Sequence, residues 1–246
     1  MSAAPRNSAL APDADAETLR VREAYARRVA DGRYGWDRPG HVFMMQDLER
    51  RILRALARHG LLPLADRRVL EIGCGNGHFL RELVKWGADP RLLTGIDVIP
   101  ERLAEARRGL PPQVRLEERS GAATGLSGGA FDLILQMTVF TSILDPAVRR
   151  TVAREMVRLL APGGAILWYD FRVDNPRNPD VRGVSRSELA ALFPACSIDC
   201  RSVTLAPPLA RTLAPRLRPV CLLLNALPPL RTHYLAVVTP AGGTAR

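Results

Sequence analysis

Lysine is almost absent from this sequence, with Lys85 the single example among 35 basic residues, and there are only four cysteines. The chain has no run of about 18 uncharged apolar residues, which excludes a transmembrane helix of the usual length. Its first 16 residues lack the basic start and apolar block of a secretory signal. The cysteines lack a second pair at metal-ligand spacing, so we predict free thiols, no metal site and a cytoplasmic location.

The composition is that of a folded globular chain. Its 246 residues, 47% hydrophobic and 24% charged, are enough for one sizeable core. A formal net charge of +10 is of the kind that nucleic acid or an anionic membrane attracts. Because the arginines are scattered and replace lysine almost completely, we attribute the charge to base-composition bias and predict no nucleic-acid partner.

Three regions follow one another along the chain. We expect residues 1–13, which are rich in Ala, Pro and Ser, to be disordered. Residues 14–60 carry apolar positions at helical spacing and predict two helices, Ala14–Ala30 and Val42–His59, which form an N-terminal lid. Residues 61–246 are predicted to form the main domain.

Short apolar runs alternate with helical stretches after Pro63, a pattern typical of a sheet covered by helices on both faces. We therefore predict an α/β fold with a seven-stranded, mostly parallel sheet. The predicted strands are Arg68–Ile72, Leu92–Asp97, Val114–Glu118, Phe131–Gln136, Ala165–Asp170, Ser197–Leu205 and Thr232–Thr239. The predicted helices between them are Phe79–Trp86, Pro100–Arg108, Pro146–Leu160 and Ser185–Leu192.

A glycine-rich turn directly follows the first predicted strand, with the sequence Glu71-Ile-Gly73-Cys74-Gly75-Asn-Gly77. Such a turn brings the backbone close to a ligand and points helix N-terminal N–H groups at it. A dinucleotide site has the spacing G-x-G-x-x-G, whereas here the third glycine comes one residue too early. The motif therefore disfavours NAD and FAD.

With its acid two residues before the first glycine, this motif resembles that of the class I S-adenosylmethionine-dependent methyltransferases. The resemblance implies a Rossmann-like fold and S-adenosylmethionine as cofactor. It also implies that the acid and the loop contact the methionine end of the cofactor; these residues are Glu71, Gly73, Cys74, Gly75 and Gly77. Asp97 ends the second strand 24 residues after Gly73, where the family's acid accepts the ribose hydroxyls, and Val98 would line the adenine.

Two further segments resemble the same family. Phe131–Gln136 looks like its fourth strand, which places Gln136 and Thr138 beside cofactor and substrate. Many relatives carry Gly-Asp-Ala after the third strand, but this chain has alanines, so the aspartate contact to adenine is missing. The backbone groups of Ala122 and Ala123 remain to flank the ring.

Methyl transfer is an in-line displacement that depends on positioning, and a hydroxyl acceptor needs a base within hydrogen-bond reach. The candidates for this base are His41, Asp170 and His233. Tyr34 and Trp36 are available as lid or cation–π groups above the methyl, although simple packing of the N-terminal helices explains them equally well.

The C-terminal part resembles that of bacterial small-molecule methyltransferases of the type 11 group. We predict methyl transfer to a small-molecule acceptor, preferably to oxygen, in glycan or natural-product biosynthesis. The alternatives are N-methylation of a small amine, an RNA or protein substrate, or a relative that binds the cofactor without catalysis. The sequence leaves the oligomeric state undetermined.

The segment at about 207–231 is rich in proline, leucine and arginine, and its prolines exclude one long helix. We expect two short helices that form a C-terminal cap. These helices either cover an apolar substrate pocket or rest on an anionic membrane. We favour the pocket, because the domain's own core can bury the leucines.

Overall fold

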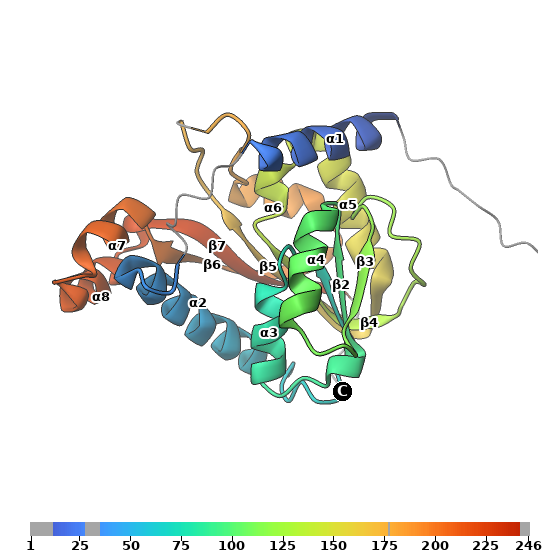
Figure 1. Cartoon of the computed structure of the whole chain (residues 1–246), viewed down its shortest axis with the longest axis horizontal. Coiled ribbons are helices and arrows are strands. Elements are labelled where there is room, and N and C mark those ends of the chain that lie inside the picture. Colours follow the sequence, from blue (N-terminus) through green and yellow to red (C-terminus); the bar gives the residue numbers. More distant parts are fainter. Residues whose placement is uncertain (1–11, 28–34, 177, 242–246) are drawn as a thin grey trace, which may run out of the picture.

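The computed structural model describes residues 12–27, 35–176 and 178–241, which form a central sheet between two layers of helices (Figure 1). The strands are β1 (Val69–Ile72), β2 (Leu93–Asp97), β3 (Arg115–Glu118), β4 (Phe131–Met137), β5 (Leu160–Phe171), β6 (Cys196–Leu205) and β7 (Arg231–Pro240). Their order is β3-β2-β1-β4-β5-β7-β6. Strands β1 to β5 are mutually parallel and β7 is antiparallel to both neighbours. The predicted seven-stranded, mostly parallel sheet is confirmed.

The helices lie near their predicted positions. They are α1 (Pro12–Ala26), α2 (Pro39–Arg58), α3 (His78–Lys85), α4 (Pro100–Gly109), α5 (Pro146–Leu159), α6 (Arg186–Leu192), α7 (Pro207–Leu213) and α8 (Arg218–Ala226). Short 3-10 turns η1 (Pro90–Leu92), η2 (Phe140–Ser142) and η3 (Pro228–Leu230) complete the connections. Asp145 and Ser185 cap α5 and α6 through their side chains, because each accepts hydrogen bonds from backbone N–H groups of the first turn.

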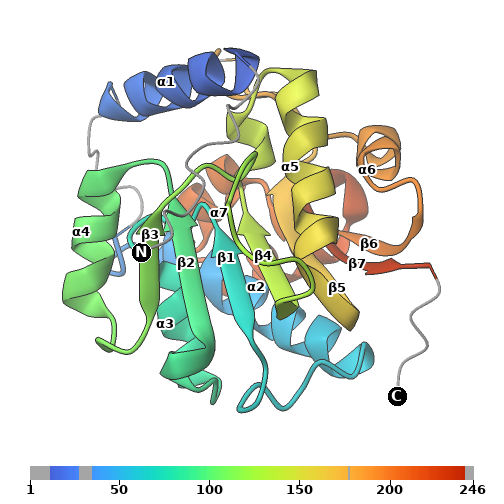
Figure 2. The same ribbon diagram turned by 90° about the vertical axis from the view of Figure 1, so that its right-hand side faces the viewer.

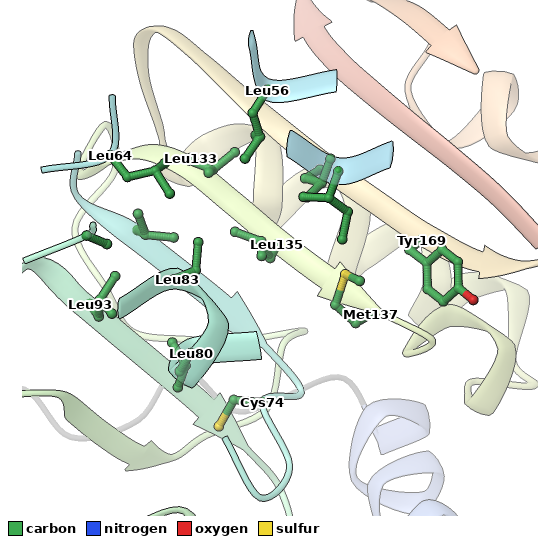
Figure 3. Packing of buried hydrophobic residues seen from close by; sticks show 14 of the residues in the cluster. Leu56, Leu64, Cys74, Leu80, Leu83, Leu93, Leu133, Leu135, Met137 and Tyr169 are labelled. Carbon is green, nitrogen blue, oxygen red and sulfur yellow. The ribbon is translucent and has the colours of Figure 1, made fainter. Parts of the chain in front are cut away.

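Alternate residues of the central strands belong to two separate hydrophobic cores, because successive side chains of a strand point to opposite faces of the sheet. On one face, Leu133 and Leu135 of β4 pack with leucines of α2 and α3, as Figure 3 shows. On the other face, Ile134 packs with residues of α5 and α6. The two apolar layers hold the sheet rigidly and fix where its strand ends lie.

Helix α1 lies across the end of the sheet where the parallel strands finish (Figure 2). The Glu17 carboxylate accepts a hydrogen bond from the N–H of Leu144, beyond β4. Arg22 forms a 2.6 Å ion pair with Glu118, the last residue of β3. The helix begins at Pro12, inside the segment expected to be disordered, and residues 1–11 lie outside the described residues. These contacts place α1 above the carboxyl ends of the strands.

Helices α7 and α8 form the predicted pair of short helices between β6 and β7. Helix α7 packs so tightly on α2 that a Cβ on Gly40 would lie 2.6 Å from the Cα of Arg211. The expectation that the core buries the leucines of this segment is wrong for most of α8, whose Leu222 and Leu223 are exposed. Only one narrow side of this short helix faces the domain.

Candidate functional site

The glycine loop after β1 is a tight turn that only glycine adopts easily. Gly73, Gly75 and Gly77 have φ values of 69°, 53° and 77°, in the left-handed region. The N–H groups of Gly73 and Cys74 donate to the carbonyl of Ile96 in β2, at 2.8 and 3.0 Å. The loop is thereby fastened to the neighbouring strand and leads directly into α3.

Asp97, at the end of β2, is joined to this loop. Its Oδ2 accepts a 2.7 Å hydrogen bond from the N–H of Gly75, and its Oδ1 accepts a 2.9 Å bond from the N–H of Ile99. The side chain is buried, and burial raises the pKa of Asp97 above its usual value. The structure thus brings together the two motifs that are 24 residues apart in the sequence.

Glu71, in β1 just before the loop, has a carboxylate oxygen without a hydrogen-bond partner among the described residues. The residue is buried, and this oxygen is its Oε2. Burial and the negative charge of Asp97 raise the pKa of Glu71 well above its usual value. The same burial and both carboxylates raise the pKa of the Cys74 thiol, which is therefore kept protonated. A cationic group beside Glu71 would relieve this cost.

Arg102 of α4 supplies part of that positive charge. Its charge lowers the pKa of both Glu71 and Asp97, opposing the effect of burial. Its guanidinium lies 5.0 Å from the ring centre of Tyr25, which connects it to α1. A Cβ on Gly75 would lie 3.0 Å from the guanidinium carbon. The sequence motif did not include Arg102, because its position in a helix surface pattern gives no sign of a role.

These residues fit the polar parts of S-adenosylmethionine. The orphaned oxygen of Glu71 suits the ammonium of the methionine end, and the carboxylate of Asp97 suits the ribose hydroxyls. The glycines leave the loop backbone uncovered by side chains of its own. Val98 follows Asp97 and is half-buried, while Ala122 and Ala123 form a short turn after β3 at the same sheet edge. Their contacts with adenine remain predictions.

The end of β4 carries strained backbone. Thr138, a β-branched residue, has φ 63°, and its N–H donates to the carbonyl of Tyr169 at 2.7 Å. Non-glycine residues in this region cost free energy and collect at functional sites. The side-chain amide of Gln136 is fully buried, donating to the Tyr169 carbonyl at 3.3 Å and accepting from the N–H of Val139 at 3.0 Å. Gln136 therefore shapes this turn from within and does not present its amide to a ligand.

Asp170, one of the predicted bases, is enclosed by the surrounding structure. Its side chain is fully buried, accepting hydrogen bonds from the N–H groups of Thr141 at 3.1 Å and Phe171 at 2.9 Å. Burial raises the pKa of Asp170 to about 7. The alternation of β5 turns this residue toward the layer that contains α5, so it holds the turn after β4 from the far side.

His233 is also enclosed. Its ring stacks on Tyr169 with centroids 4.7 Å apart and lies 3.8 Å from Phe171. Burial lowers the pKa of His233 to about 3, so the ring is neutral at physiological pH. Its Nδ1 is 3.0 Å from the hydroxyl of Thr232. His233 is therefore part of a buried aromatic stack with Tyr169 and Phe171.

His41 is the predicted base that lies nearest the surface. It stands in the first turn of α2, half-buried, with its ring centroid 5.4 Å from that of Trp36. Trp36 is also 5.9 Å from His78, the first residue after the glycine loop. Burial and the positive charge of Arg211 lower the pKa of His41, which keeps its ring neutral. Tyr34, the other predicted lid residue, lies outside the described residues.

The remaining polar groups of the described chain suggest no metal centre. Within residues 12–27, 35–176 and 178–241, no group of three or more His, Cys, Asp or Glu side chains is arranged to hold an ion. All four cysteines are free, as predicted. None of the helices in these ranges is both long enough and apolar enough to span a bilayer.

Comparison with known proteins gives the same picture. The family model described as a methyltransferase domain matches residues 69–164, which include the glycine loop and Asp97. The ubiquinone biosynthesis O-methyltransferase of Xanthomonas oryzae pv. oryzae is 34% identical over 109 residues, covering 43% of each chain. That of Bordetella avium is 35% identical over 120 residues, covering 47% of this chain and 46% of the relative. The chain thus matches less than half the length of these curated relatives.

A solved structure extends the likeness over nearly the whole chain. The 1,6-didemethyltoxoflavin-N1-methyltransferase of Burkholderia thailandensis, solved with 1,6-didemethyltoxoflavin and S-adenosylhomocysteine, superposes with a TM-score of 0.60. It covers 97% of this chain and 92% of its own at 20% identity, which establishes the fold alone. Taken with the loop and its acid, the family match identifies residues 69–164 as a methyltransferase domain of the class I, S-adenosylmethionine-dependent type.

Proposed function

We propose that this protein transfers the methyl group of S-adenosylmethionine to a hydroxyl of a small-molecule acceptor. The observation that carries the proposal is the 2.7 Å hydrogen bond from the Gly75 N–H to Asp97, which unites the loop and the acid at one sheet edge. The preference for oxygen is supported by relatives named ubiquinone biosynthesis O-methyltransferases. A glycan or natural-product pathway stays a prediction.

The cofactor, when bound, supplies a methyl group on a positively charged sulfur. Glu71 and the loop N–H groups would hold its amino-acid end, and Asp97 would accept its ribose hydroxyls. Val98, Ala122 and Ala123 would flank the adenine. Because the reaction disperses charge, the protein's main task is to hold the reacting groups in line and exclude water.

His41 is the residue we assign as proton acceptor for a hydroxyl substrate. It is neutral at physiological pH because burial and Arg211 lower its pKa, and only a neutral imidazole can take a proton. Trp36 covers it on one side and reaches toward His78 at the glycine loop. Asp170 and His233 are enclosed by the core and are less suited to this role.

Methylation of nitrogen is a second candidate. It is supported by the name of the Burkholderia thailandensis protein, an N1-methyltransferase whose fold matches nearly the whole chain. An amine acceptor that is already unprotonated needs no base. Loss of His41 would then leave the rate almost unchanged, which separates the two candidates.

The proposal is tested in two steps with the full chain. Isothermal titration with S-adenosylmethionine and S-adenosylhomocysteine measures cofactor binding independently of any acceptor. The chain is then incubated with methyl-labelled S-adenosylmethionine and matched pairs of acceptors that differ only in a hydroxyl or an amine. Label in the hydroxyl compounds supports O-methylation, label in the amines alone supports the second candidate, and absence of cofactor binding refutes both.

A further inference from the structure

Helix α8 and its two flanking residues carry large apolar side chains that face away from the protein. The exposed residues are Leu217 (48%), Val220 (36%), Leu222 (49%), Leu223 (71%) and Leu227 (51%), and together they are called the α8 patch. They include most of the large hydrophobic side chains that are exposed in the described chain. An exposed group of this kind marks a contact with a partner or a membrane.

The inner side of α8 is anchored by a polar contact. The buried Asn225 donates from Nδ2 to the Asp47 carboxylate of α2 at 2.8 Å, and Cys221, one turn earlier, is also buried. Packing therefore does not require leucines on the outer side. Cys221 and Leu224 pack against a hydrophobic cluster on the inner side, so α8 has apolar side chains on both its inner and its outer side. In the usual surface helix, polar residues face water and apolar residues face the core.

The C-terminal segment that carries the patch has charged residues of one sign only. From Arg201 to the end of the sequence there are arginines but no aspartate or glutamate. Arg216 and Arg218 are exposed on either side of Leu217, and neither forms an ion pair with any described residue. Arg218 donates a 2.7 Å hydrogen bond to the neutral side chain of Gln46, so its charge is not compensated there. Leucines flanked by arginines without acidic partners are the composition of a segment that lies in the interface of an anionic bilayer.

We propose that the α8 patch binds peripherally to an anionic membrane surface, with its leucines among the acyl chains and Arg216 and Arg218 at the headgroups. A second copy of the chain fits the patch less well. A two-fold dimer built on it would bring these two arginines close to the same arginines of the partner, with no nearby acid in the C-terminal segment to compensate. An anionic bilayer supplies both negatively charged headgroups for the arginines and acyl chains for the leucines.

The patch is linked through α7 to the start of α2, where His41 is the base of the proposed function. Helix α7, which leads into α8, contacts Gly40, the residue before His41. Membrane attachment through α8 would therefore hold this side of the molecule near the bilayer, where an acceptor with an apolar part collects. The membrane contact itself does not depend on methyl transfer, and its test has no catalytic readout.

The test is flotation of the full chain with vesicles of phosphatidylglycerol and phosphatidylcholine, compared with phosphatidylcholine alone. We expect the chain to float with the anionic vesicles at low salt and to bind more weakly at about 0.15 M salt. In Arg216→Glu/Arg218→Glu, partitioning should weaken by more than about twentyfold, because each lost arginine alone accounts for about fivefold. In Leu222→Ser/Leu223→Ser it should weaken by at least about tenfold.

Matched variants on other helices separate this surface from general charge and hydrophobicity. Arg107→Glu/Arg108→Glu changes the net charge by the same amount as the α8 double variant, but on the exposed side of α4. Leu19→Ser removes a leucine that is 58% exposed on α1. Both should float like the unchanged chain, and circular dichroism should show every variant folded. The proposal is overturned if the unchanged chain does not float at low salt or if the α8 variants and the controls behave alike. It is also overturned if sedimentation shows a dimer that the α8 variants dissociate.

Discussion

Replacing Gly75 by alanine should separate the requirements of the fold from those of the cofactor site. Gly75 has φ 53°, and a left-handed conformation costs a residue with a Cβ about 1–2 kcal/mol. The new Cβ would also lie 3.0 Å from the guanidinium carbon of Arg102. That side chain is flexible at its far end, so it moves aside at little cost to stability.

Gly60 offers a matched control far from the loop. Its φ is 64°, and a Cβ there would meet no heavy atom within 4 Å. Gly60→Ala and Gly75→Ala should therefore lower the free energy of unfolding by a similar amount, about 1–2 kcal/mol in urea titrations. Both variants pay the same backbone cost, so any further difference between their free energies of unfolding comes from the side chains around the loop.

Only Gly75→Ala should weaken the binding of S-adenosylhomocysteine, by roughly tenfold or more in isothermal titration. The added methyl narrows the approach to the loop and displaces Arg102 from the two buried carboxylates. If the two alanine variants bind S-adenosylhomocysteine equally well, the loop does not contact the cofactor and the site assignment is refuted. Adding Arg102→Ala to Gly75→Ala shows how much of the loss comes from the displaced guanidinium.

Three other outcomes are expected. Asp97→Ala should weaken S-adenosylmethionine binding by roughly 1–3 kcal/mol in calorimetry, because a charged acceptor is lost, and unchanged affinity would remove Asp97 from the site. His41→Gln should lower kcat toward a hydroxyl acceptor by about 10²- to 10⁴-fold while leaving cofactor affinity intact, and an unchanged rate argues against a base at this position. The pKa of Asp170 is raised from 3.8 to about 7 in the folded protein. The folded state therefore holds this proton more tightly than the unfolded state, and the free energy of unfolding falls as pH rises from 3.8 to about 7. Urea titrations should then show the unchanged chain losing stability relative to Asp170→Asn between about pH 4 and pH 7, by on the order of 4 kcal/mol, and parallel profiles would show that the carboxyl is not desolvated.

The fold could be predicted almost completely because its signals are local. Each strand is a short apolar run bounded by turn residues, and proline marks the start of α4 and α5. The largest error is in β5, which begins at Leu160 and not at Ala165. Pro162 and Gly163 indicate a turn by composition, yet here the chain continues alongside β4 with a shift in register near Phe131.

The meeting of the glycine loop with Asp97 was predictable from the sequence, whereas the positions of the predicted bases were not, for a physical reason. The glycine loop and Asp97 take their positions from the ends of two strands, so their spacing in the sequence suffices. The roles of Asp170 and Tyr169 depend instead on which face of β5 each side chain occupies, and a shift by one residue exchanges them. Contact between Trp36 and His78 depends on how α2 meets α3, which no local pattern specifies.

The C-terminal segment shows why the number of leucines does not reveal what they contact. From the sequence we expect the domain's core to bury these leucines, but a helix of nine residues buries only one narrow side. Here that side is occupied by Cys221 and Asn225, with Leu224 partly buried beside them, and the bond from Asn225 to Asp47 adds a polar contact. The leucines that remain outside cost free energy in water unless something covers them. The arginines beside them limit what that covering can be, because only an anionic partner satisfies both features of the same surface.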